Sequence, residues 1–240
     1  MRAVASLRVS GRTVAFVVLA GVVVGWFVLA PHLTSVGLWW AIAIGAAAVM
    51  PGTFLLVLLA LPLWPGRWLL PAAAALALVA LGCTAAGWGL PANFAKLSAA
   101  VFAGWAFLRF FEELSWVVIV AALIPLVDAF SVWRGPTHAI TTHHFEVYTS
   151  VSIAFLVPGG GAAYLGPPDI LFYALFLAAA ARWQLRVVPT WLAVTGMYSL
   201  TLVVANAADV SGLPALPFLS VGFLGANADL LWRRLRTRTT

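Results

Sequence analysis

The sequence predicts an all-α polytopic membrane protein: a bundle of about eight transmembrane helices, with nine as the alternative, and a short strand before the helix that begins near Asp169. Composition carries most of this prediction. Of the 240 residues, 64% are hydrophobic and 8% are charged, and the mean hydropathy is +1.05. Too little polar surface exists to cover a soluble globule of this size. We therefore expect a multi-pass protein of the cell membrane, in contact with the lipid bilayer.

The basic residues indicate topology and not nucleic-acid binding. Thirteen Lys and Arg against seven Asp and Glu give a net charge of +6. These cations are dispersed at the ends of apolar runs and at the C-terminus, where positive charge sets membrane orientation. The single cysteine, Cys83, lies within an apolar run and excludes an intrachain disulfide. We expect no nucleic-acid partner.

Residues 1–113 read as a scaffold of apolar spans. The run 14–30 is of near-spanning length and is expected to be a retained first span. The run 36–64 is longer than one crossing needs and is interrupted at Pro51, which favours one tilted, kinked helix over two short spans. Residues 68–88 and 91–111 supply the next two spans. Lys96, one turn inside the latter, is expected to snorkel to the interface.

Asp128 stands inside the apolar run 114–133. An ionisable side chain at membrane depth is costly enough that a functional site is the default interpretation. The polar stretch that follows, 134–150, is predicted to be a solvated loop. It contains His138, His143, His144 and Glu146, but no spacing typical of a zinc site, so we expect no metal there.

A strand and three spans follow. Residues 151–157 are β-branched and aromatic, too short to cross as a helix, and end in a glycine-rich hinge, which indicates a strand. A helix is expected from about Asp169 to Ala181, because proline is tolerated in a first turn. Further spans are expected at 188–207 and 214–232. The connector then brings Asp128 and Asp169 to the same membrane face.

Two carboxylates that meet in a low-dielectric site share one proton and titrate as a unit. The ionised member takes a proton from water while the protonated member polarises a carbonyl, which is the chemistry of an aspartic protease. Since Asp169 would begin a helix, the helix dipole favours its charge and makes Asp128 the proton carrier. Spacing alone leaves open an inert pair or the ion path of a transporter, although no convincing internal repeat is present.

Three motifs in order carry a family resemblance. Asp128-Ala-Phe-Ser-Val, Gly166-Pro-Pro-Asp169-Ile-Leu-Phe-Tyr and Pro214-Ala215-Leu216 resemble those of the presenilin and signal peptide peptidase family of intramembrane aspartyl proteases. The resemblance covers roughly the C-terminal half, with Val127 in place of the tyrosine of eukaryotic members and Pro168 in place of a glycine. It implies that residues 114–240 form the catalytic region, with Asp128 and Asp169 as the catalytic pair and with Gly166 and the Pro-Ala-Leu element near substrate.

The same resemblance implies hydrolysis of peptide bonds within transmembrane segments of other membrane proteins or signal-peptide remnants, without a cofactor. A non-proteolytic protein, either a transporter or a catalytically dead relative, is the alternative. A substrate helix has its carbonyls bonded internally, so a protease must unwind it and supply new partners. The strand at 151–157 is close enough to the Asp169 helix to do so by strand addition, with Ile153 and Phe155 as substrate-binding positions. The alternative for this strand is a plug of the bundle.

Orientation follows from the arginines. With eight spans, the N-terminal arginines, Arg67, Arg109, Arg182, Arg186 and the C-terminal arginines all fall on the cytoplasmic side, which satisfies the positive-inside rule better than nine spans. Both termini are then cytoplasmic and the 134–150 stretch is external.

Overall fold

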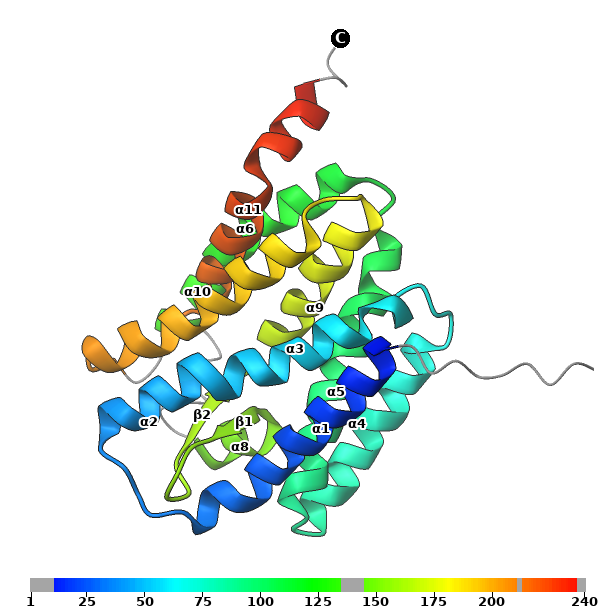
Figure 1. Cartoon of the computed structure of the whole chain (residues 1–240). Coiled ribbons are helices and arrows are strands. Elements are labelled where there is room, and N and C mark those ends of the chain that lie inside the picture. Colours follow the sequence, from blue (N-terminus) through cyan, green and yellow to red (C-terminus); the bar gives the residue numbers. More distant parts are fainter. Residues whose placement is uncertain (1–10, 135–144, 211–212, 237–240) are drawn as a thin grey trace, which may run out of the picture.

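The computed structural model describes residues 11–134, 145–210 and 213–236. These residues are mostly helical, with one two-stranded antiparallel sheet (Figure 1). Short 3-10 turns at Ala30–His32, Leu61–Leu63 and Leu108–Phe110 extend three of the helices. The helices and strands are α1 Gly11–Leu29, α2 Leu38–Ile44, α3 Met50–Ala60, α4 Leu69–Ala85, α5 Gly89–Phe107, α6 Leu114–Arg134, α8 Phe145–Val151, β1 Ile153–Leu156, β2 Ala162–Leu165, α9 Pro167–Arg182, α10 Val187–Ala207 and α11 Leu216–Arg236.

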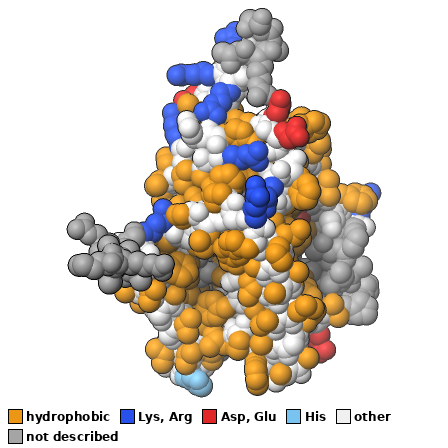
Figure 2. Space-filling view, turned by 90° about the vertical axis from the view of Figure 1, so that its right-hand side faces the viewer, with side chains coloured by type: hydrophobic (Ala, Val, Ile, Leu, Met, Phe, Trp, Pro, Cys, Tyr) orange, Lys and Arg blue, Asp and Glu red, His pale blue; other side chains and the backbone are white. Residues whose placement is uncertain are grey.

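Four helical segments within the described residues are long and apolar enough to cross a membrane: Gly11–His32, Leu38–Leu63, Leu114–Arg134 and Val187–Ala207. Their outward side chains are apolar, and hydrophobic atoms cover most of the face drawn in Figure 2. Water does not favour such a surface, whereas lipid does. The expected fold class is therefore confirmed at this level: the described residues are mostly helical, with four helices long and apolar enough to cross a membrane and one small sheet.

The run 36–64 forms one helical segment, Leu38–Leu63, as predicted. Its irregularity is a π-helical turn at Gly45–Val49, which ends two residues before Pro51. Proline lacks the N–H that would bond to the preceding turn, and a widened turn accommodates its ring. The Ser199 hydroxyl of α10 donates to the Ala46 carbonyl at 2.6 Å, which satisfies a backbone group that the π turn exposes.

The core is centred on α9. Ile170 and residues 173–180 of this helix are fully buried, among α5, α6, α10 and α11. Gly104 of α5 permits the closest approach, since a Cβ atom there would stand 2.2 Å from the carbonyl oxygen of Leu171. A run of small residues, Ala178 to Ala180, continues this close packing along α9.

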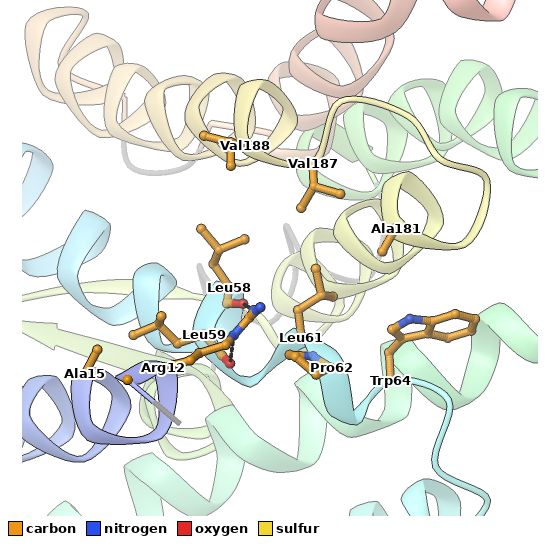
Figure 3. Close-up of a pocket in the computed structure, with 11 residues that line it drawn as sticks. Arg12, Ala15, Leu58, Leu59, Leu61, Pro62, Trp64, Ala181, Val187 and Val188 are labelled. Atoms are coloured by element: carbon orange, nitrogen blue, oxygen red, sulfur yellow. Dashed lines mark hydrogen bonds between the residues drawn. The ribbon is translucent and has the colours of Figure 1, made fainter. Parts of the chain in front are cut away.

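One end of the bundle carries most of the described arginines. Arg12 donates to the carbonyls of Leu58 and Leu59 at the end of α3 (Figure 3). Arg182 bonds to the Leu108 carbonyl at 2.9 Å after α5, and Arg234 bonds to the Trp183 carbonyl after α9. Helix C-termini leave such carbonyls without intrahelical partners and carry partial negative charge.

A cavity of about 690 Å³ at this end is lined by Arg12, the end of α3, the end of α9 and the start of α10, so these helix ends lie together. In Figure 2 the Lys and Arg side chains gather on the upper part of the face, and a histidine lies at its lower end. The hairpin of β1 and β2 lies in the lower part of Figure 1, away from the C-terminal end of α11.

Two local predictions need correction. The end of the expected solvated loop is helical, because α8 covers Phe145–Val151 and the hydroxyls of Thr149 and Ser150 bond back to carbonyls three residues earlier. The expected strand is shorter, Ile153–Leu156, and pairs with a second strand that the sequence did not reveal. The expected glycine hinge is the hairpin turn, in which Gly159 and Gly160 adopt φ of +85° and +81°.

Candidate functional site: two carboxylates at helix N-termini

Asp128 lies on α6 and reaches the start of α11. Its Oδ2 atom accepts the N–H of Leu216 at 3.0 Å. Leu216 is the first residue of α11, so its N–H has no partner inside its own helix. The carboxylate therefore caps a helix 88 residues away in the chain, and this contact joins the first expected motif to the third.

Asp169 lies in the first turn of α9, behind two prolines that lack N–H groups. Its Oδ2 atom accepts the N–H of Gly166 at 2.9 Å. Its backbone carbonyl accepts the hydroxyl of Tyr198, on α10, at 2.7 Å. Carboxylates in a first helical turn interact favourably with the helix dipole. The position of Asp169 is thus fixed both by its own helix start and by α10.

The two carboxylates lie close enough to interact electrostatically. Asp128, Asp169 and the Pro-Ala-Leu element, expected from three separate stretches, are thus brought to one place. The structure removes the reason for assigning the shared proton to Asp128. That assignment depends on Asp169 alone lying at a helix N-terminus, but Asp128 also faces a helix N-terminus, that of α11. The dipole argument therefore applies to both and does not assign the shared proton.

The Pro-Ala-Leu element is buried, with Ala215 6% and Leu216 4% exposed. The backbone N–H of Leu216 donates to the Asp128 carboxylate, and a role of this element near substrate stays a prediction. Gly166 has φ −67° and ψ 152°, a conformation open to any residue. A Cβ atom at Gly166 would lie 3.4 Å from Asp169 Oδ2, an ordinary contact.

The hairpin places the predicted strand differently from the expectation. β1 pairs antiparallel with β2, with Ile153 opposite Leu165 and Leu156 opposite Ala162. The side chains of Ile153 and Phe155 are 1% and 0% exposed. These side chains pack into the core, so only the backbone of β1 at these two positions could pair with a substrate, and their assignment as substrate-binding positions stays a prediction.

The backbone of β1 is also occupied on the side away from β2. The Asn93 side chain bonds to both the N–H and the carbonyl of Ala154, and the Trp26 indole donates to the Leu156 carbonyl. Any strand addition is therefore directed to the outer side of β2, Ala162–Leu165, which no other described strand covers.

Sequence reasoning missed two tyrosines beside the carboxylates. Tyr198 is 1% exposed and stacks with Phe54 and Tyr173, with ring centroids 5.5 and 6.0 Å away. Tyr148 of α8 lies near the pair. Burial is the main cause that raises the pKa of its phenol, and the negative charge of Asp169 raises this pKa further. A polar residue at a buried helical position was the available signal for Tyr198, but its partner depends on how α9 and α10 pack.

No group of three or more metal-ligating side chains occurs among the described residues. The histidines considered above, His138, His143 and His144, lie outside the described residues. The described polar groups of the site are the two carboxylates, the tyrosine hydroxyls and backbone N–H groups, whose chemistry is proton transfer and hydrogen bonding.

Comparison of the chain with protein-family models, with curated proteins and with solved structures finds no match. The function is therefore inferred from the residues of the site.

Proposed function

We propose that this protein is an intramembrane aspartyl protease that hydrolyses peptide bonds within transmembrane segments of other membrane proteins. The observation that carries the proposal is the meeting of Asp128, Asp169 and the Pro-Ala-Leu element at one place, with the Asp128 carboxylate on the Leu216 N–H. The motif order that resembles presenilin and signal peptide peptidase homologues favours the same function.

The pair works through one shared proton. The ionised carboxylate takes a proton from a water molecule, whose oxygen attacks the scissile carbonyl carbon, while the protonated carboxyl gives its proton to the carbonyl oxygen. As the tetrahedral intermediate collapses, the C–N bond breaks, the nitrogen takes the proton that the first carboxylate removed from water, and a hydroxyl of the intermediate returns its proton to the other carboxylate. The products are a new carboxyl group and a new amine. These steps use only the groups of the site, water and the peptide.

A transmembrane substrate must be unwound before this reaction. The outer side of β2 supports this step, because Leu165 leads through Gly166 directly into the helix start that carries Asp169. An extended substrate segment paired with β2 would exchange its internal helical hydrogen bonds for bonds to the hairpin. Tyr148 donates to the Tyr164 carbonyl at 3.5 Å on this side, and a pairing segment would displace that long contact.

A second role has a specific observation in its favour. Both carboxylates accept N–H groups at helix N-termini, so a non-proteolytic protein, such as a transporter or an inactive relative, would use them as caps. Substitution of either aspartate by asparagine distinguishes a helix cap from an acid-base catalyst. The side-chain oxygen of asparagine still accepts an N–H, which retains the cap, but it cannot exchange a proton with water.

The test is cleavage of a reporter with one transmembrane segment in membranes that contain the wild type, Asp128→Asn or Asp169→Asn at matched levels. We expect each variant to fold and to lose cleavage below detection, a loss of about 10²-fold to 10⁴-fold or more. Asp229→Asn is the matched control, because Asp229 forms an exposed ion pair with Arg186 at 2.8 Å. Near wild-type turnover in either site variant would leave the pair as helix caps only.

The proposed topology has eight spans, with the arginine-rich end of the bundle in the cytoplasm. The contacts of Arg12, Arg182 and Arg234 with neighbouring helix ends support it, since they gather at one end the residues that the positive-inside rule assigns to one side. Reporter fusions at Thr240 and within residues 137–145 test the assignment. An external C-terminus would refute eight spans.

A further inference from the structure

The side of β1 that faces away from β2 is closed by side chains from two other helices. Asn93 of α5 bonds to Ala154, and Trp26 of α1 bonds to the Leu156 carbonyl at 2.9 Å. Lys96, one turn after Asn93, donates to the carbonyls of Ser150 at 3.0 Å and Ser152 at 2.6 Å, just before the strand. This row of donors replaces the neighbouring strand that β1 would have in a larger sheet.

Asn93 makes the most specific of these contacts. Its amide oxygen accepts the Ala154 N–H at 2.7 Å, and its amide nitrogen donates to the Ala154 carbonyl at 3.0 Å. A neighbouring β-strand offers the same pair, one acceptor and one donor at one residue. Asn93 is 6% exposed and lies within α5. The side chain therefore acts as a one-residue substitute for a strand.

Lys96 is a second polar side chain of α5 that binds the same segment of the chain. The sequence led us to expect its ammonium to snorkel to the interface, but it is bound to two backbone carbonyls at the end of α8. Asn93 and Lys96 are three positions apart and so lie on the same face of α5. One face of α5 thus holds the chain at three successive points: Ser150, Ser152 and Ala154.

We infer that Asn93 is a positioning residue that sets the register of cleavage, by closing β1 and holding the hairpin at a fixed offset from Asp169. This inference rests on the proposed function. β2 continues through Gly166 to Asp169 without an intervening element, so the position of the hairpin determines which bond of a β2-paired segment reaches the carboxylates. Strand pairing repeats every two residues, so a loosened hairpin allows slips of two residues.

The test uses the full-length protein in lipid vesicles, with two measurements on each variant. Hydrogen exchange of the peptide covering residues 153–165 reports closure of the hairpin, whether or not the protein cleaves anything. Mass spectrometry of the products from a single-span reporter reports the cleavage register. The variants are Asn93→Ala, which removes both bonds to Ala154, and Trp26→Phe, which removes one donor and keeps an aromatic ring. Trp191→Phe is the matched control, because its indole donates to the Phe54 carbonyl of α3 at 3.1 Å and not to the backbone of the hairpin.

We expect Asn93→Ala to raise the exchange rate of this peptide about tenfold, since buried peptide groups lose their partners. It should also add products that differ from the main product by two residues. Trp26→Phe should also raise the exchange rate and add shifted products, but to a smaller extent. If Asn93→Ala does not accumulate in membranes, Trp26→Phe alone tests whether closing β1 sets the cleavage register. Trp191→Phe should match the wild type in both.

The outcomes distinguish a failure of the role inferred for Asn93 from a failure of the proposed protease function. Faster exchange with an unchanged product register overturns the positioning role and leaves the proposed protease function intact. Unchanged exchange in both variants overturns closure of β1 by these side chains. A wild type that cleaves no reporter overturns the proposed function, and with it the claim about register, while the exchange measurement still shows whether Asn93 closes the strand.

Discussion

α9 and α6 carry the two carboxylates in contrasting surroundings. On α9, Ile170 and residues 173–180 are fully buried, so the helix is fixed by packing on all sides. On α6, only Leu114, Val117 and Ala121 are buried, and Val127, next to Asp128, is 61% exposed. Asp128 is instead held by its hydrogen bond to the start of α11. The pair thus combines a carboxylate fixed by the core with one positioned by a helix cap.

The largest effect is expected from a substitution that disturbs the packing of α9, the helix that carries Asp169. Gly104→Ala places a methyl group 2.2 Å from the Leu171 carbonyl oxygen and must push α5 away from α9. We expect a loss of about 3 kcal/mol in the free energy of unfolding, at the upper end for overpacking, together with loss of cleavage. Denaturation in detergent measures the first effect. Gly82→Ala is the control, because nothing lies within 4 Å of a Cβ atom there. Equal stability of the two variants would mean that α5 does not fix α9.

The next effect concerns the cap that holds Asp128. Leu216→Pro removes the N–H that the carboxylate accepts, while the first position of a helix tolerates proline. We expect cleavage to fall about tenfold to a hundredfold, since hydrogen bonds to charged groups are among the stronger ones. Leu216→Ala, which loses the same buried side chain but keeps the N–H, is the control in the same cleavage assay. Equal activity of the proline and alanine variants would show that the cap does not position Asp128.

A smaller effect is expected at the hairpin. In the observed register, Ala162 is opposite Leu156, whose carbonyl points away from β2 to Trp26, so the N–H of Ala162 points outward as well. Ala162→Pro removes this outward donor without removing a bond between the strands, and we expect cleavage to fall severalfold while the hairpin persists. Ala163→Pro, one residue later, should break the hairpin itself. Cleavage by Ala162→Pro at the wild-type rate would exclude strand addition to β2.

The smallest effects are expected before Asp169. Pro168→Gly, which restores the residue usual in the resembling family, and Gly166→Ala should both retain cleavage within about twofold. Glycine can adopt the φ of proline, and the backbone at Gly166 suits alanine. Cleavage rates at matched membrane levels check both. A large loss in Gly166→Ala would indicate that substrate approaches this backbone more closely than a methyl group allows.

Much of this architecture could be predicted from the sequence, because its signals are local. Long apolar runs marked the helices, Pro51 marked the irregular one, and a carboxylate in an apolar run marked Asp128. The remainder depends on contacts between distant segments. β2, Ala162–Leu165, has no alternating pattern and is defined by its partner. The Asn93 contact spans 61 residues, and the cap on Leu216 exists only because α6 and α11 pack together.

Whether Asp128 takes part in peptide hydrolysis is best measured with purified protein in lipid vesicles and a reporter that has one transmembrane segment, with the products identified by mass spectrometry. We expect the wild type to cut the reporter within its transmembrane segment and Asp128→Asn, which keeps the cap on Leu216, to leave it uncut. Cleavage by Asp128→Asn at the wild-type rate, or no cleavage by the wild type, would contradict this expectation.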